Sequence, residues 1–443
     1  LDIMENFRNH KRSKEFDIFC KPYLLSSVEQ LFDCEIEYCD QPISKIQKDY
    51  GIDLLSNPKR GTYIHSASEV TIIGRVLEDK SSKYAMSLTL KNGEFSSIDR
   101  LLNVFEAALS LTLSRSHKFG FADRPSQFGQ ELIELFIAKY YSKGFFDHRR
   151  FLLLMELFKK LATTSFEGRN FTTGLIITKS HYAYAEKGEN YRGGKLYELN
   201  SPRVLDQINM LDKRLWYLSD GQSSFFVCNK QLEMRNCFVL DDSTINPDDF
   251  NKKHLLSETL LGADALLRVT SENELSIVGA SGIEFNYKEN RWRIRDLRQI
   301  SKIIKETLNV TDAFVQALLY YVFYLSKRRF SSIIWIPTDL SDIDSYLMTK
   351  NNLTNDRFSI LDMNHKSTLL RLFSSDGASV ININGDVISF GSVIDISKAS
   401  INGVKGTGES VSTLLGENGM SVKISQDGKI SLFGVNGKGK III

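Results

Sequence analysis

The feature that most constrains the fold is a repeat, because the last third of the chain follows the pattern of its middle. An apolar helical stretch, Phe151 to Leu161, is followed by Arg169-Asn170-Phe171-Thr172-Thr173 and an apolar strand. The same order returns with Ala313 to Leu325, then Arg328-Arg329-Phe330-Ser331-Ser332 and a second apolar strand. A repeat of this length predicts two structural copies of one unit.

Three further blocks keep nearly one offset. Phe225 to Leu232 aligns with Val380 to Val387 when Asn229 is set on Asn384, an offset of 155 residues. Leu260-Leu261-Gly262 falls on Leu414-Leu415-Gly416 at 154, and Val269 to Ser276 resembles Ile424 to Ser431. This agreement favours a duplicated α/β unit over the alternative, two unrelated sheets that both prefer Ile, Val and Asn-Gly turns.

Length and periodicity suggest how the copies are arranged. A chain of 443 residues is too long for one ordinary core. We expect an α/β protein in three parts: an N-terminal, regulatory α+β region over 1–145, a degenerate copy of the unit that acts as a sensor over 146–300, and a mixed-sheet domain over 301–443. Period and composition predict strands over 69–76 and 84–90, and helices over 98–113, 130–141 and 148–161.

Composition excludes several classes of protein. The net charge is +2, from 56 basic and 54 acidic residues, so no overall field draws the chain to nucleic acid or to an acidic membrane. The five cysteines are an odd set without a Cys-x-x-Cys pair, which argues against a disulfide framework and indicates a reducing compartment. The apolar stretch Ala313 to Leu325 is shorter than the ~20 residues that span a bilayer, and no signal peptide precedes Met4. We therefore expect a cytoplasmic protein that binds neither membrane nor nucleic acid.

Two polar loops in the second copy have residue types that suit chemistry. The first is Asp376-Gly377-Ala378, at a predicted strand entry where the first copy has Gln222 to Phe225. A carboxylate followed by glycine can hold a divalent metal or accept a proton from a hydroxyl group, with the glycine letting a substrate approach. The structural alternative is an ordinary Asp-Gly turn.

The second loop leads into a predicted helix and consists of Gly406, Thr407, Gly408, Glu409 and Ser410. A glycine turn before a helix presents free N–H groups and a partial positive charge to an anion. Ser and Glu in a first helical turn also make an ordinary cap. The first copy has Lys252-Lys253-His254 in this place, so if one copy binds a nucleotide, we expect it to be the second.

Taken in order, these segments resemble the diadenylate cyclase (DAC) domain, the catalytic unit of enzymes that make cyclic di-AMP. The resemblance covers about residues 310–435 and rests on Asp376-Gly377-Ala378 and on the Gly406-Thr407 loop, with a fainter echo over 148–285. It implies a nucleotidyltransferase that condenses two nucleoside triphosphates, ATP first, into a cyclic dinucleotide and releases pyrophosphate. Two such domains face each other in these enzymes, which implies at least a homodimer here.

The resemblance also implies roles for residues. Asp376, Gly377 and Ala378 would form the catalytic element, with Asp376 holding Mg²⁺ or Mn²⁺ or drawing the proton from the 3′-hydroxyl group. The phosphates would lie against the second loop, and Glu409 or Glu417 would supply a second metal ligand; the loop residues concerned are Gly406, Thr407, Gly408 and Ser410.

One departure from the family pattern opens an alternative function. The family continues after Gly-Thr with an Arg-His pair that contacts the triphosphate, whereas this chain has Gly408, Glu409 and Ser410. A carboxylate in place of a cation repels phosphate. The alternatives are therefore a divergent cyclase, an inactive nucleotide or cyclic dinucleotide sensor, and a scaffold in which neither copy binds.

For two other groups of residues, the sequence is compatible with both a functional and a structural role. Arg291, Arg293, Arg295 and Arg298 suit either a solvated surface or a phosphate pocket. Tyrosines interleaved with basic residues suit either a base-stacking surface or an exposed hairpin; they are Tyr182, Tyr184, Tyr191 and Tyr197.

Overall fold

The structure is a computed structural model with mixed strands and helices, and the expected α/β class is confirmed. It describes residues 21–39, 48, 62–67, 70–76, 82–90, 98–119, 125–142, 146–179, 194–205, 212–240, 260, 262–270, 273–341, 343–352, 358–398, 407–435 and 438–443. Contacts divide the chain into two compact units, residues 1–242 with 259–295, and residues 243–258 with 296–443.

The first unit begins with a small antiparallel sheet and a group of helices. The sheet has the order β1-β4-β3-β2, with β1 at Cys34–Cys39, β2 at Thr62–Ala67, β3 at Val70–Val76 and β4 at Ser82–Leu90. The helices are α2 (Lys21–Phe32), α4 (Ile98–Phe119), α5 (Pro125–Ser142) and α6 (His148–Ala162). Asp147 begins α6 by accepting a hydrogen bond from the Arg149 N–H group at 2.9 Å, a typical N-cap.

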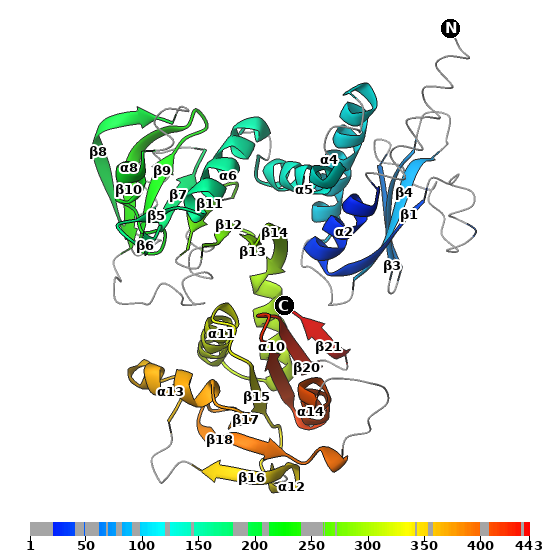
Figure 1. The fold of residues 1–443 in the computed structure, drawn as a ribbon, viewed down its shortest axis with the longest axis vertical. Coiled ribbons are helices and arrows are strands. Elements are labelled where there is room, and N and C mark those ends of the chain that lie inside the picture. The colour runs from blue at the N-terminus through cyan, green and yellow to red at the C-terminus, as the bar shows by residue number, and fades with distance from the viewer. Residues whose placement is uncertain are drawn as a thin grey trace. The chain divides into compact units, whose positions relative to one another are not determined.

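The larger sheet of this unit, as far as the described residues show it, has the order β14-β13-β12-β11-β7-β9-β10-β8. Its strands are β7 (Thr173–Ile177), β8 (Gly194–Val204), β9 (Ser224–Cys228), β10 (Glu233–Leu240), β11 (Ala265–Val269), β12 (Leu275–Gly279), β13 (Ile283–Lys288) and β14 (Arg291–Asp296). Strands β7 and β9 pair in parallel, and β11 pairs antiparallel to β7 (Figure 1). In β14, Arg291 and Arg293 are exposed while Trp292 and Ile294 are buried, as on an ordinary strand surface.

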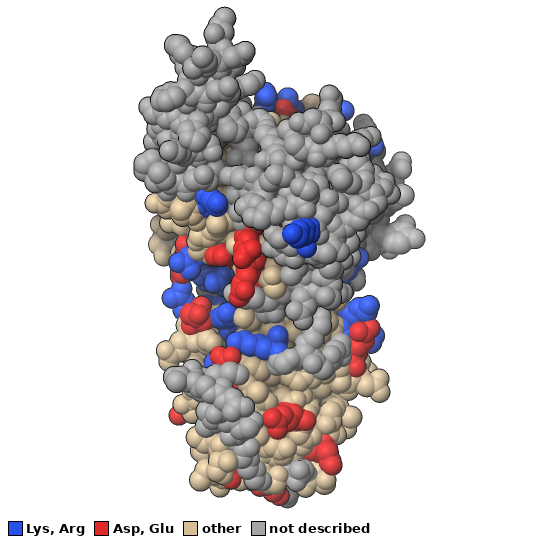
Figure 2. Space-filling view, turned by 90° about the vertical axis from the view of Figure 1, so that its right-hand side faces the viewer, with Lys and Arg blue, Asp and Glu red and all other residues tan. Residues whose placement is uncertain are grey.

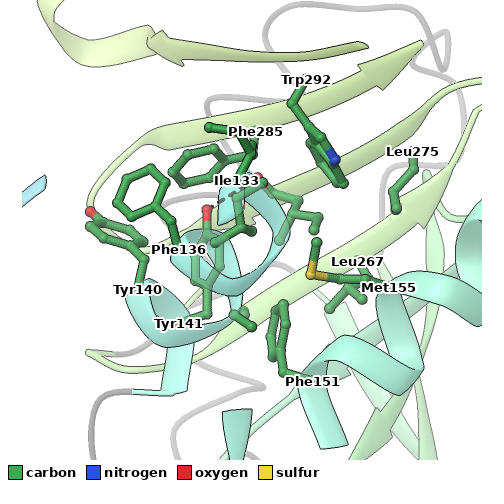
Figure 3. Packing of buried hydrophobic residues seen from close by; sticks show 14 of the residues in the cluster. Ile133, Phe136, Tyr140, Tyr141, Phe151, Met155, Leu267, Leu275, Phe285 and Trp292 are labelled. Atoms are coloured by element: carbon green, nitrogen blue, oxygen red, sulfur yellow. Dashed lines mark hydrogen bonds between the residues drawn. The ribbon is translucent and has the colours of Figure 1, made fainter. Parts of the chain in front are cut away.

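Helices α5 and α6 pack on one face of this sheet and share its core. Phe136 of α5 lies edge-on to Phe285 of β13, with ring centres 5.5 Å apart. Figure 3 shows Met155 of α6 beside Leu267 of β11, and Phe151 of α6 stacks on Tyr141 of α5. The hydroxyl group of Tyr141 donates to the carbonyl oxygens of Ile277 and Ile283, at 3.1 and 3.0 Å. Helix α5 is thus part of the core under β12 and β13, and the boundary expected at residue 145 falls inside one continuous core.

The second unit begins with two capped helices. Asp296 accepts a hydrogen bond from the Gln299 N–H group and begins α10 (Leu297–Leu308), which ends at Asn309 in the left-handed conformation. Thr311 then begins α11 (Asp312–Lys327) in the same way. No single described helix is long and apolar enough to cross a membrane; α10 and α11 pass that test only as a pair, bent by 117°.

The sheet of the second unit, within the described residues, has the order β16-β18-β17-β15-β19-β20-β21. Its strands are β15 (Ser332–Ile336), β16 (Leu347–Asn352), β17 (Ala378–Ile381), β18 (Val387–Ile394), β19 (Met420–Ile424), β20 (Ile430–Val435) and β21 (Lys438–Ile442). Helices α10, α11 and α13 (Lys366–Phe373) pack with Ile334 and Val422 on one face. On the other face, α14 (Thr407–Leu415) packs with Trp335 and Val380.

The two larger sheets share one topology. Read outward from the parallel pair, β7, β9, β10 and β8 correspond to β15, β17, β18 and β16, and β11, β12 and β13 correspond to β19, β20 and β21. The central pair is parallel in both sheets, and the next strand on the other side is antiparallel in both. The repeat read from the sequence is therefore also a repeat of strand order and direction.

The alignment of one repeat block is wrong by two residues. Strand pairing and turn hydrogen bonds make Asn382, not Asn384, the equivalent of Asn229. The Asn229 side chain accepts from the N–H groups of Gln231 and Glu233, and the Asn382 side chain accepts in the same way from Asn384 and Asp386. The sequence misled because Asn occurs at both 382 and 384, with Ile383 between them.

Candidate functional site

The Asp376-Gly377 pair lies at the entry to β17, between α13 and the strand. The Asp376 side chain is exposed, and its Oδ1 atom accepts a hydrogen bond from the Gly377 N–H group at 3.0 Å. Gly377 has a φ angle of +95°, and a Cβ atom there would lie 2.7 Å from the carbonyl carbon of Gly391. The glycine is thus required by the close approach of β18, whereas the sequence interpretation attributed it to the approach of a substrate.

Ala378 follows and serves the core. Its side chain is 1% exposed and packs with Trp335 and Val380 under α14. The Ala378 side chain is thus part of the core beneath α14 and is not on the surface, where a catalytic element would meet a substrate.

A row of residues across three strands connects this entry to α14. Ala378 pairs with Ile333 of β15, and Ile333 pairs with Lys423 of β19. Since neighbouring strands lie about 4.8 Å apart, the backbones of Ala378 and Lys423 are roughly 10 Å apart. Asp376 and Lys423 thus lie at the same end of the sheet.

The N-terminus of α14 lies over this row. A Cβ atom on Gly408 would be 3.3 Å from Cε of Lys423, so the lysine side chain passes directly beside the first turn of the helix. Thr407 is exposed, while Gly408, Glu409 and Ser410 are half-buried, and Gly406 lies outside the described residues. The structure thus brings the first turn of α14 and the Asp376 entry to one end of the sheet.

Glu409 forms an ion pair with Lys440, a residue that was not singled out in the sequence. Its Oε1 atom lies 2.9 Å from Nζ of Lys440 in β21, and both side chains are about one-third exposed. This ion pair neutralises the carboxylate within the first turn of the helix. Glu409 is held by the protein itself and is not poised as a metal ligand.

Glu417 lies at the opposite end of the sheet from Asp376. It belongs to the short helix η6 (Gly416–Asn418), where the Asn418 carbonyl accepts from Nε1 of Trp335 and Asn418 Oδ1 accepts from Thr338. Asp376 and Glu417 therefore cannot share one ion, and the expected metal pair does not fit the structure. Among the described residues, no group of three His, Cys, Asp or Glu side chains converges.

The first copy also has an Asp-Gly pair at the equivalent strand entry. Asp220 and Gly221 precede β9, separated from Phe225, the equivalent of Ala378, by residues 222–224. The Asp220 carboxylate accepts from the N–H groups of all three of these residues, each at 2.8 Å. The contrast expected from the sequence, a carboxylate in one copy only, is therefore wrong; the copies differ in whether the carboxylate is exposed.

The cation of the row is also present in both copies. Arg268 of β11 pairs with Gly174 of β7, as Lys423 of β19 pairs with Ile333 of β15. Arg268 is 1% exposed, whereas Lys423 is half-buried. Sequence reasoning missed Lys423 because a single lysine in a strand has no motif; the repeat alignment of β11 with β19 was the signal that could have found it.

Charges of both signs are interspersed on the described part of the face in Figure 2. This distribution agrees with the balance of 56 basic and 54 acidic residues. The expected phosphate-pocket alternative for the arginines of β14 finds no support, because Arg291 and Arg293 are exposed on the strand and Arg295 lies 3.8 Å from Glu284. The lysine segment at 252–254 and the tyrosines at 182, 184 and 191 lie outside the described residues.

Comparisons with known proteins give little. No family model matches the chain, and no curated protein matches it. Among solved structures, the chain is similar to the hypothetical membrane spanning protein from Bacillus cereus, with 16% identity over 33% of this chain and 76% of that chain. The TM-score is 0.24.

Proposed function

We propose that residues 312–442 form a nucleotide-binding unit that resembles diadenylate cyclase domains and senses a nucleoside triphosphate or a cyclic dinucleotide, with ATP and cyclic di-AMP as the first candidates. The observation that carries the proposal is the row Ala378, Ile333 and Lys423, which sets the exposed Asp376 and the first turn of α14 at one end of the sheet. Free N–H groups, a helix dipole and a lysine together favour a phosphate there.

Binding without turnover is favoured by the first turn of α14. Glu409 stands where the related cyclases have a cation, and its carboxylate is already neutralised by Lys440. A triphosphate at this turn gains no charge contact from Glu409, so the grip needed for an in-line displacement is weaker than in the family pattern.

Calorimetric titration of the full chain with ATP, GTP and cyclic di-AMP, in the presence of Mg²⁺ or Mn²⁺, tests the proposal. We expect saturable binding of at least one of them, with about one site per chain, and at least tenfold weaker binding by a Thr407→Asp variant, which places a negative charge at the first turn. The proposal fails if none of the three nucleotides binds at millimolar concentration.

A second candidate function is the condensation itself, favoured by the state of Asp376. This carboxylate is exposed and, among described residues, accepts only from its neighbour Gly377, so it is available to draw a proton from a hydroxyl group. The 3′-hydroxyl group of one nucleotide would attack the α-phosphorus of another, breaking its bond to pyrophosphate, and a second such attack would close the ring. Two chains would supply the two nucleotides, because the first copy encloses its own aspartate.

Chromatography of the titration mixtures separates the two candidates. A cyclic dinucleotide and two equivalents of pyrophosphate from the wild-type chain, and none from Asp376→Asn, would select the enzyme. Binding with neither product selects the sensor. The rate of an active form should rise more than in proportion to chain concentration if a homodimer is required.

A further inference from the structure

We infer that Lys423 is the phosphate-binding cation of this site and replaces, from a strand, the cation that the α14 loop lacks. The inference rests on the proposed nucleotide-binding function and adds the residue that determines its affinity for phosphate. Gly408 is part of the inference, because the absence of a side chain at position 408 leaves room for the end of the Lys423 side chain.

The space beside Gly408 is filled by the end of the Lys423 side chain. A Cβ atom at position 408 would be 3.3 Å from Cε and 3.7 Å from Nζ of Lys423. A larger side chain at position 408, in the first turn of α14, would displace the end of the lysine side chain. The glycine that departs from the family pattern therefore admits a cation from β19 to the same first turn.

The neighbouring lysine cannot take this role as readily. Lys440 is paired with Glu409 at 2.9 Å, so its charge is already balanced. Within the part of the chain that the structure describes, the ammonium group of Lys423 has no hydrogen bond and no ion pair, and the side chain is half-buried beside the first turn of α14. A cation that is partly desolvated and unpaired gains more from an arriving phosphate than one that must first leave a carboxylate.

The equivalent position in the first copy is less accessible. Its equivalent residue, Arg268, is also a cation but is 1% exposed, and the Asp220 carboxylate of the same sheet end accepts N–H groups of its own loop. In the first copy, therefore, the cation is buried and the carboxylate is already hydrogen-bonded by its own loop. We assign the ligand to the second copy alone, at one phosphate group per chain contacting Lys423.

Titration of the full chain with Mg·ATP, cyclic di-AMP and tripolyphosphate tests the inference. Lys423→Gln should bind each of these at least tenfold more weakly, as expected for a lost hydrogen bond between charged groups, and should show a smaller dependence of affinity on salt. Lys423→Arg should keep most of the affinity. Lys302→Gln, which removes an exposed lysine of α10 from the same unit, is the matched control and should bind as the wild type does.

Gly408→Val gives a second, independent variant. Its side chain would occupy the place of Lys423 Cε, so affinity should fall although every charge remains. Thermal unfolding of each variant shows whether it is folded.

The outcomes distinguish two failures. If the wild-type chain binds none of the three probes, the proposed function fails. If it binds them and both Lys423→Gln and Gly408→Val bind equally well with an unchanged salt dependence, the inference about Lys423 is overturned and the proposed function stands.

Discussion

Asp220 and Asp376 precede equivalent strands, but only the carboxylate of Asp220 is enclosed by its own loop. Three N–H groups and the hydroxyl groups of Ser223 and Ser224 donate to Asp220, whereas Asp376 is exposed and accepts from Gly377. One topology therefore holds one aspartate that stabilises a turn and another that faces solvent. The difference lies in residues 222–224, which separate Gly221 from Phe225, whereas Ala378, the equivalent of Phe225, follows Gly377 directly.

The Asp220 network predicts a dependence of stability on pH. Burial raises the pKa of Asp220, but the hydrogen bonds from the Ser223 hydroxyl group and from the N–H groups of Ser224, Gln222 and Ser223 together lower it below its ordinary value. A lowered pKa in the folded state means that the carboxylate contributes stability above the unfolded pKa of about 3.9, and that this stability is lost as pH falls through the folded pKa. We expect Asp220→Asn to reduce the free energy of unfolding by about 1–2 kcal/mol at pH 7 and by less at pH 3.

Urea denaturation at both pH values measures this effect on the first unit. Asp376→Asn is the matched control, since its carboxylate is exposed, and should change the free energy of unfolding by less than about 0.5 kcal/mol. Equal losses for Asp220→Asn at the two pH values would contradict the account.

Alanine substitutions at Gly377 and Gly408 should differ in their effect on the free energy of unfolding. Ala at position 377 would adopt a φ angle of +95° and place Cβ 2.8 Å from the Ser392 carbonyl oxygen, so we expect a loss of about 2–4 kcal/mol from strain and displaced backbone. Ala at position 408 meets only the flexible end of Lys423 within a helix and should be neutral or slightly stabilising. Chemical denaturation of the second unit measures both variants. A Gly377→Ala variant as stable as the wild type would show that β18 does not approach as closely as described.

The Tyr141 hydroxyl group tests whether α5 belongs to the core of the first repeat. It is buried and donates to the carbonyl groups of Ile277 and Ile283, so Tyr141→Phe should lose about 1–2 kcal/mol from the free energy of unfolding. Tyr287→Phe is the matched control, because its hydroxyl group contacts Asn290 at an exposed site. The account is wrong on this point if the two variants are equally stable.

The turn asparagines test the structural alignment of the repeat. Asn229→Ala and Asn382→Ala each remove a side chain that binds the backbone two and four residues further on, and each should cost about 1–2 kcal/mol. Asn384→Ala should be almost neutral, because Asn384 is exposed. Thermal unfolding of the three variants measures this, and a larger loss at Asn384 than at Asn382 would restore the alignment taken from the sequence.

The sequence predicted the repeat and most of its elements, because these are local patterns. The helical period of the stretches that begin at Phe151 and Ala313, with the aligned blocks after them, was sufficient to predict the repeat. Strands β12 and β20 correspond at the offset found in the sequence. The membership of α5 in the core under Phe285 could not be read, since it depends on contacts more than 130 residues apart in the chain.

The candidate site was predictable only in part. Asp376 and the loop at Thr407 were found by residue type, and strand pairing and the Gly408–Lys423 contact bring them to one end of the sheet. Lys423, Lys440 and the true role of Gly377 depend on which strands are neighbours, and single-residue composition does not encode that. The pairing of Asp376 with Glu417 failed for the same reason, because a carboxylate close to the α14 loop in sequence lies past the far end of the helix.

Hydrogen exchange of the full chain with and without Mg·ATP or cyclic di-AMP tests the central claim most directly. If nucleotide binds at the end of the sheet that holds Asp376 and Lys423, peptides covering 374–382 and 407–424 should exchange more slowly at saturation, while those covering 218–228 remain unchanged. Slower exchange confined to the first repeat, or no change anywhere at concentrations that saturate binding, would contradict it.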